Sequence, residues 1–437
     1  MTENWNRKTW HLAGPIMISN VSVPLLGAVD TAVMGRLPGP HYLGAVAVGA
    51  LVFSFVYAGL NFLRMGTTGL TAQSYGARDP DQLRAWLARA GILAIGLGTA
   101  LIALQVPIIA AALALIAPSD QVAPLTESYF LIRIWSAPAT LMNFAILGWF
   151  FGVQNARAAL VTQVAMNGVN IVLDLWFVIV LGWGVEGVAW ATLISEVSAS
   201  VLGFYLVARI LRTIGGRWNI RRAINPDRIR RMLRVNGDIF VRSLCLQVSF
   251  VAFTAVAARM GDLVLAANAV LLNFVMLASY ALDGFANAVE ALTGEAVGAR
   301  NRVRFRAAVV ATGRWALIFA AGFTAIFLAF GGVFIDILSA VPEVRITARE
   351  YLVWAALVPA VGVWSFQLDG IYIGSTCTVD MRNGMIISMA VFGVFAAILV
   401  PVYANHGLWL AFWIFMATRA ATLGLWYPRL ERSVDGA

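Results

Sequence analysis

The hydrophobic positions of this chain form long runs, and short polar breaks separate them. Twelve runs are long enough for a helix that crosses a bilayer, which needs about 20 mainly apolar residues. Most runs are continuous rather than alternating, which argues against a β-barrel. The expected helices are 12–34, 42–65, 84–114, 122–149, 157–182 and 187–212, followed by 237–260, 264–292, 305–330, 346–374, 383–403 and 407–427.

Composition supports a membrane protein. Hydrophobic residues make up 60% of the 437 residues and charged residues only 12%, whereas a soluble domain carries about 25% charged residues. We therefore expect an all-α integral membrane protein, with twelve transmembrane helices in two pseudo-symmetric six-helix lobes around a central cavity. A net charge of +9 would suggest nucleic acid in a soluble protein. Here the basic residues lie mainly in short loops, so membrane topology explains them better and no nucleic acid is expected.

The basic residues predict the orientation. With the N-terminus in the cytoplasm, 22 lysine and arginine residues fall on the cytoplasmic side, nine of them within 209–234, and four fall on the opposite side. This bias predicts that both termini are cytoplasmic, in a bacterial inner membrane. The first apolar run has no cleavage site after it, so we expect it to be retained as the first helix.

The longest polar stretch, 213–236, divides the chain into an expected N-lobe (1–212) and an expected C-lobe (237–437). Its charge run is interpreted as a cytoplasmic linker that lies against anionic lipid headgroups, rather than as a nucleic-acid arm.

The two halves repeat. Residues 70–78 read LTAQSYGAR and residues 292–300 read LTGEAVGAR, at an offset of 222. Thr31-Ala32-Val33 matches Thr254-Ala255-Val256 at an offset of 223. A nearly constant offset indicates duplication. Because each half has an even number of helices, the halves should enter the membrane in the same sense.

The differences between the halves point to chemistry. Asp30 aligns with Phe253, so only the N-terminal half has a carboxylate at this place, and an aspartate inside a membrane is costly and usually functional. Asn170 and Asp174 share one helical face, and Thr192 lies in the next helix. Together with Asp30 these side chains could bind a proton or Na⁺, since both accept hard oxygen donors. The alternative is a structural hydrogen-bond network.

Further polar residues inside the apolar runs are candidates for a substrate cavity. In the C-terminal half, Asp283 and Glu290 lie seven residues apart on one face. They and Asp369 could form a second cation site or part of the cavity, or could pair with Arg242 or Arg314. The candidate cavity residues are Asn143, Asn167, Glu196, Asp283, Glu290 and Asp369.

Two prolines, Pro15 and Pro24, fall inside the first helix. Proline removes a backbone hydrogen bond and kinks a helix. Both are therefore candidate hinges for a helix that bears Asp30, although a static kink is the plain alternative.

Enzymatic functions find no support in the sequence. We find no His-Glu-x-x-His, no Gly-x-Ser-x-Gly and no phosphate loop. Without an ATPase module, transport would take its energy from an ion gradient or from a partner. We expect no cofactor, only a coupling ion (H⁺ or Na⁺), and a monomer.

At this point the chain resembles the multidrug and toxic compound extrusion (MATE) family, in its DinF-like branch. The stretches that carry the resemblance are Val29-Asp30-Thr31-Ala32-Val33-Met34-Gly35 and Ala281-Leu282-Asp283-Gly284-Phe285-Ala286, followed by Ala288-Val289-Glu290-Ala291.

The resemblance implies export of organic, often cationic, amphiphiles in exchange for H⁺ or Na⁺. It assigns coupling to Asp30 and maps the partner residues onto Asn170, Asp174 and Thr192. The other bacterial branch uses acids in the C-terminal half, which Glu290 and Asp369 match only loosely. The alternative function is a flippase for lipids or lipid-linked oligosaccharides of the same superfamily, although such proteins often have fourteen helices and a more cationic cavity.

Overall fold

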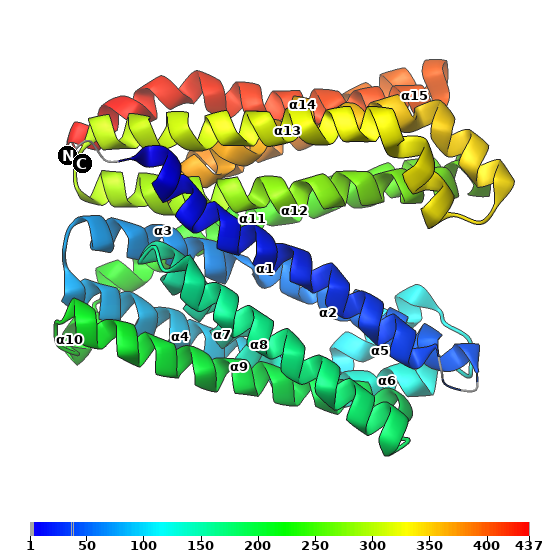
Figure 1. The fold of residues 1–437 in the computed structure, drawn as a ribbon, viewed down its shortest axis with the longest axis horizontal. Coiled ribbons are helices and arrows are strands. Elements are labelled where there is room, and N and C mark those ends of the chain that lie inside the picture. Colours follow the sequence, from blue (N-terminus) through cyan, green and yellow to red (C-terminus); the bar gives the residue numbers. More distant parts are fainter. Residues whose placement is uncertain (1–3, 36, 38, 437) are drawn as a thin grey trace. The chain divides into compact units, whose positions relative to one another are not determined.

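The computed structural model describes residues 4–35, 37 and 39–436, apart from the side chains of 23–26, 28 and 436. Nearly all of this part is helical (Figure 1), as the hydropathy pattern predicts. The first half contains α1 (Trp5–Met34), α2 (Pro40–Leu60), α3 (Phe62–Gly76), α4 (Pro80–Ala103), α5 (Gln105–Ile116), α6 (Ala123–Arg133), η1 (Ile134–Ser136), α7 (Ala137–Gly152), α8 (Ala156–Asp174), η2 (Leu175–Val180), α9 (Gly184–Ile214) and α10 (Ile220–Ala223).

The second half consists of fewer and longer helices. It contains α11 (Pro226–Ala258), α12 (Asp262–Gly298), α13 (Arg302–Leu338), α14 (Pro342–Gly374), α15 (Thr378–Ser433) and the short η3 (Val434–Gly436). Helix α11 begins at Pro226, so residues 226–236 of the expected linker are helical. Hydropathy does not detect these first turns because they are strongly charged.

The helix count agrees with the sequence. Among the described residues, ten helical segments are long and apolar enough to cross a membrane. The last of them, α15, is two helices joined at Ala404, whose φ of 46° and ψ of −126° are not helical. Helix α1 is a further helix of 30 residues. Each of the twelve expected helices therefore has a counterpart, and this is a multi-pass membrane protein.

Contacts divide the chain into two compact units. One consists of Met1–Met17 together with Arg234–Ala437, and the other of Ile18–Leu233. The division falls within α1, two residues after Pro15. In the unit that holds the C-terminal half, Trp10 of α1 packs against Phe285 and Trp315, with ring centroids 5.8 and 5.1 Å apart.

The duplication is visible in the backbone. Arg78 and Arg300, which are 222 residues apart, both have left-handed conformations (φ of 54° and 51°) at the end of a helix. The next residue caps the following helix in each half. Asp79 accepts from Gln82 N at 3.0 Å, and Asn301 accepts from Arg304 N at 2.9 Å. The same helix–turn–helix geometry at a constant offset supports two copies of one ancestral unit.

Candidate functional site

The carboxyl groups of Asp30 and Asp174 face each other as hydrogen-bonding neighbours within the unit Ile18–Leu233. Asp30 lies near the end of α1, and Asp174 is the last residue of α8 and has no exposed surface. The Oδ1 atom of each is buried and has no hydrogen-bond partner in the described part of the chain. Ionised carboxylates only accept hydrogen bonds, so a bond between the two requires a proton. Two neighbouring carboxyl groups of this kind can share one proton.

Asn170 lies one helical turn before Asp174 and is a neighbour of this acid pair. In the amide orientation that satisfies both polar atoms, its Nδ2 donates to Asp174 Oδ2 at 3.2 Å and its Oδ1 accepts from Thr192 N at 3.2 Å. The Thr192 hydroxyl donates to Val188 O at 3.0 Å. The structure thus brings together Asp30, Asn170, Asp174 and Thr192, the four residues that the sequence analysis grouped as the candidate coupling site.

Arg133 is a member of this cluster that the sequence analysis missed. It ends α6 and donates from Nη1 to Tyr129 Oη at 2.6 Å, and its guanidinium lies 4.5 Å from the centroid of the Phe53 ring. It interacts electrostatically with both carboxylates, Asp30 and Asp174. A signal was available, since an arginine inside an apolar run is as costly in a membrane as an aspartate.

Glu196 lies on α9 and also interacts electrostatically with Arg133. Asn143 of α7 donates from Nδ2 to both Oε2 and the backbone O of Glu196, at 2.9 Å in each case. The Oδ1 of Asn143 accepts from Ser200 Oγ at 2.8 Å. Two of the candidate cavity residues, Asn143 and Glu196, therefore hold each other in place and join α7 to α9.

Asn167 connects α8 to α1. Its Nδ2 donates to Ser22 Oγ at 2.8 Å, and its Oδ1 accepts from Gln163 Nε2 at 3.3 Å. Asn167 therefore anchors the helix that carries Asp30, at a point eight residues before Asp30.

The two candidate hinges do not interrupt α1, which continues as a helix through Pro15 and Pro24. The side chain of Pro24 lies outside the described part of the structure.

A π-helix begins directly after Asp174 and covers Leu175–Val180. The sequence predicts one continuous α-helix over 157–182, and the structure corrects this. A π segment widens the helix and turns the side chains that follow, and such segments are frequent at functional sites. Here it ends the regular part of α8 at the paired carboxylate.

The C-terminal half has no acid pair at the equivalent place. Phe253, which aligns with Asp30, is fully buried and packs edge-on against Trp409 with ring centroids 5.1 Å apart. Asp369 is ion-paired with Arg242, as the sequence suggested, and with Arg419 Nη2 at 2.6 Å. The buried charges around Asp369 are therefore compensated.

The two other acids of that half differ in their surroundings. Asp283 of α12 interacts electrostatically with Arg419 and with Tyr280. Glu290 lies seven residues later on α12 and is 1% exposed. Asp283 and Asp369 both interact with Arg419, whereas Asp30, Asp174 and Glu196 all interact with Arg133 in the other half. The candidate site in which several acids share one arginine is the one around Asp30 and Asp174.

The sequence comparison identifies the family. A sequence model of the MatE family matches residues 15–176 and matches again at 239–402. These two matches cover well over half of the 437 residues. The chain belongs to the MatE family.

The relatives agree with this assignment to the MatE family. DNA damage-inducible protein F of Escherichia coli (strain K12) is 42% identical over 432 residues, which cover 98% of this chain and 93% of that protein. Multidrug export protein MepA of Staphylococcus aureus is 20% identical over 64% of this chain and 62% of that protein. A crystal structure of MATE in the bent conformation has the same fold, with a TM-score of 0.91, 22% identity, and coverage of 99% of this chain and 97% of that one.

The family match also reproduces the duplication. Its two segments begin 224 residues apart, at 15 and 239, close to the offset of 222 that separates Arg78 from Arg300 in the backbone. The MatE unit thus occurs twice in this chain. The acid pair belongs to the first copy only.

Proposed function

We propose that this MatE-family chain is a secondary antiporter that exports organic, mostly cationic amphiphilic compounds in exchange for H⁺. The observation that carries the proposal is the buried contact between Asp30 and Asp174, whose Oδ1 atoms lack a donor within the described residues. A proton on one carboxyl group allows it to donate a hydrogen bond to the other. Its loss leaves two adjacent negative charges that attract a cation.

The competition between proton and substrate provides the coupling. When the pair is ionised, the negative charge of the site favours a cationic substrate. When a proton arrives from the outer side, the charge falls and the substrate is released. We propose that the two halves rock to expose the site alternately, in a bacterial inner membrane with both termini in the cytoplasm. The similarity to multidrug export protein MepA of Staphylococcus aureus supports a broad range of substrates.

The orientation of Asn170 favours H⁺ over Na⁺. In the amide orientation that satisfies both of its polar atoms, Nδ2 lies 3.2 Å from Asp174 Oδ2, and an N–H donor stabilises a carboxylate but repels a metal ion. Na⁺ would require Asn170 to turn its oxygen toward Asp30 and Asp174 and to give up the backbone N–H of Thr192. H⁺ binding needs no such rearrangement.

The test is ethidium efflux from proteoliposomes under an imposed pH gradient or an imposed Na⁺ gradient, with Asp30→Asn as the comparison. We expect efflux that follows the pH gradient in the wild type and is lost in the variant. Efflux driven by the Na⁺ gradient alone would identify Na⁺, and not H⁺, as the coupling ion. Efflux that survives Asp30→Asn would move coupling to Glu290 and Asp369, and no efflux with either gradient would favour the flippase function.

A further inference from the structure

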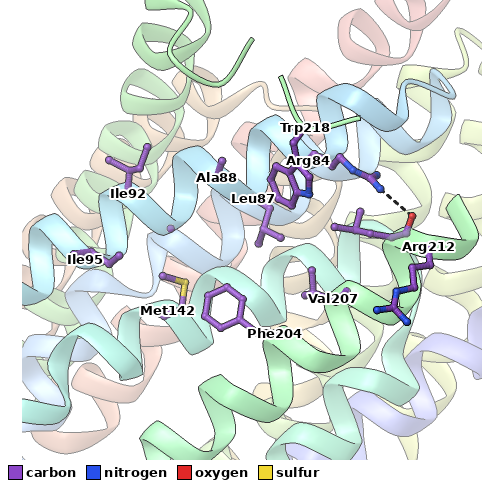
Figure 2. Close-up of a pocket in the computed structure, with 13 residues that line it drawn as sticks. Arg84, Leu87, Ala88, Ile92, Ile95, Met142, Phe204, Val207, Arg212 and Trp218 are labelled. Atoms are coloured by element: carbon purple, nitrogen blue, oxygen red, sulfur yellow. Dashed lines mark hydrogen bonds between the residues drawn. The ribbon is translucent and has the colours of Figure 1, made fainter. Parts of the chain in front are cut away.

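A groove of about 570 Å³ lies between α4, α7 and α9, within the unit Ile18–Leu233. Figure 2 shows a row of apolar side chains that ends at Arg84 and Trp218. Ile92 and Ile95 are 63% and 53% exposed, so this wall of the groove is open to the surroundings. The apolar lining includes Leu87, Ile92, Ile95, Met142, Phe204 and Val207.

The basic end of the groove contains two arginines without carboxylate partners. Arg84 is 7% exposed and donates to two neutral carbonyls, Leu211 O at 3.0 Å and Gly215 O. Its Nε is buried and has no hydrogen-bond partner in the described part of the chain. Arg212 lines the same end, and neither arginine forms an ion pair among the described residues. This end therefore carries two arginines that form no ion pair with a carboxylate in the described part of the chain.

The start of the linker is folded back onto α4 and fixes Trp218 at the groove. The backbone N of Arg217 donates to Asp81 Oδ1 at 2.7 Å, and Arg222 pairs with Asp79 at 3.0 Å. The centroid of the Trp218 ring lies 5.8 Å from the Arg84 guanidinium carbon. Tryptophan is enriched at the membrane–water interface, so this end of the groove has the composition of a headgroup region.

The length of the groove fits one leaflet of a bilayer. Arg84 and Ile95 are eleven residues apart on α4, which corresponds to about 16 Å at 1.5 Å per residue. The hydrocarbon core of a bilayer is about 30 Å thick, so one leaflet contributes about half of that. A phosphate beside the arginines would place its acyl chain along the exposed isoleucines.

We propose that this groove binds one anionic phospholipid of the cytoplasmic leaflet. Arg212 and Arg84 contact its phosphate, Trp218 lies beside the headgroup, and one acyl chain lies along Leu87, Ile92 and Ile95. The cytoplasmic leaflet follows from the nine arginines of 209–234, which the topology rule places on that side. The proposal concerns a site apart from the Asp30–Asp174 pair and does not depend on antiport.

The test is native mass spectrometry of the full-length protein in detergent, with phosphatidylglycerol or phosphatidylcholine of identical chains. We expect the wild type to retain one phosphatidylglycerol in preference to phosphatidylcholine. Arg212→Gln should weaken phosphatidylglycerol binding about five-fold, the equivalent of about 1 kcal/mol per arginine near a membrane surface. The matched control is Arg209→Gln, which removes the same charge one turn away and outside the groove.

A second variant tests the acyl-chain part. Ala88→Trp fills the groove from a partly buried position on α4 without removing charge and should reduce retention of phosphatidylglycerol. Three outcomes would overturn the proposal. The first is an equal loss of phosphatidylglycerol binding in Arg209→Gln and Arg212→Gln, which would indicate diffuse attraction to the basic surface. The second is equal retention of phosphatidylglycerol and phosphatidylcholine by the wild type. The third is undiminished retention of phosphatidylglycerol in Ala88→Trp.

Discussion

Arg133 donates its 2.6 Å hydrogen bond to the phenol of Tyr129, although it interacts electrostatically with Asp30, Asp174 and Glu196. Its immediate partners are neutral: a phenol and the face of the Phe53 ring. The cation therefore stays in place whether the acids are ionised or protonated. In the proposed antiport mechanism, Arg133 is therefore a fixed positive charge that disfavours protonation of the nearby acids.

Replacing Arg133 with Gln should raise the pH at which ethidium efflux is half-maximal. A positive charge near a carboxylate favours the ionised form, so its removal lets the Asp30–Asp174 pair keep a proton to higher pH. An opposite charge at close range changes such an equilibrium by about one pH unit or more. The measurement is the pH of half-maximal ethidium efflux in proteoliposomes.

Arg133→Lys is the matched control for this variant, because it keeps the charge and loses the planar contacts. Its pH of half-maximal efflux should stay near that of the wild type even if its maximal rate is lower. If Lys and Gln shift the profile equally, Arg133 acts through packing and not through its charge.

Asn170 and Asn167 provide a second matched pair on one helix. Asn170→Ala removes the N–H that stabilises Asp174 as a carboxylate, which is worth about 1.5–3 kcal/mol for a hydrogen bond to a charged group. The pH of half-maximal efflux should rise by about one to two units. Asn167→Ala removes a hydrogen bond to Ser22 and should lower the free energy of unfolding by about 1 kcal/mol. It should not change the pH of half-maximal efflux. A shift of similar size in both variants would contradict the assigned roles.

The sequence predicts the helices, the duplication and the faces on which Asn170 and Asp174 lie, because these follow from hydropathy and from helical spacing. The same reasoning could not place Arg133. Its position beside the acids depends on how α6 packs against α2 and α9, and no spacing along one helix encodes that packing. The direction of the Asn170 amide likewise depends on the backbone N–H of Thr192 in a neighbouring helix.

Two local features escape the sequence for different reasons. The π-helix Leu175–Val180 has the same apolar composition as an α-helix, so hydropathy cannot distinguish them. The early start of α11 at Pro226 is hidden because its first turns are basic and do not contribute to an apolar run. In contrast, the break between the last two helices was predicted, and Ala404 provides it.

Asp369 should be a structural acid rather than a coupling acid. Asp369→Asn leaves Arg242 and Arg419 buried side by side without their shared carboxylate, and breaking a buried pair in this way costs about 3–5 kcal/mol. We expect a clearly lower unfolding temperature in detergent, followed by tryptophan fluorescence. Asp30→Asn should unfold close to the wild type, because an amide can replace the protonated acid.

A double variant checks this interpretation of Asp369. Adding Arg419→Gln to Asp369→Asn removes one of the two unpaired charges and should recover part of the lost stability. If the single variant Asp369→Asn unfolds like the wild type and instead abolishes efflux, Asp369 takes part in transport and its ion pairs open during the cycle.

The contact between α12 and α14 depends on a glycine. A Cβ added at Gly370 would lie 2.3 Å from the carbonyl oxygen of Ala286, whereas a Cβ at Gly362, two turns earlier on α14, would meet its nearest atom at 3.5 Å. Gly370→Ala must push the two helices apart and should destabilise the protein by about 1–3 kcal/mol. Gly362→Ala should be neutral or stabilise by up to about 1 kcal/mol, since alanine restricts the unfolded chain. Thermal unfolding of the two variants under identical conditions measures the difference, and equal unfolding temperatures would mean that α12 and α14 are not in close backbone contact at Gly370.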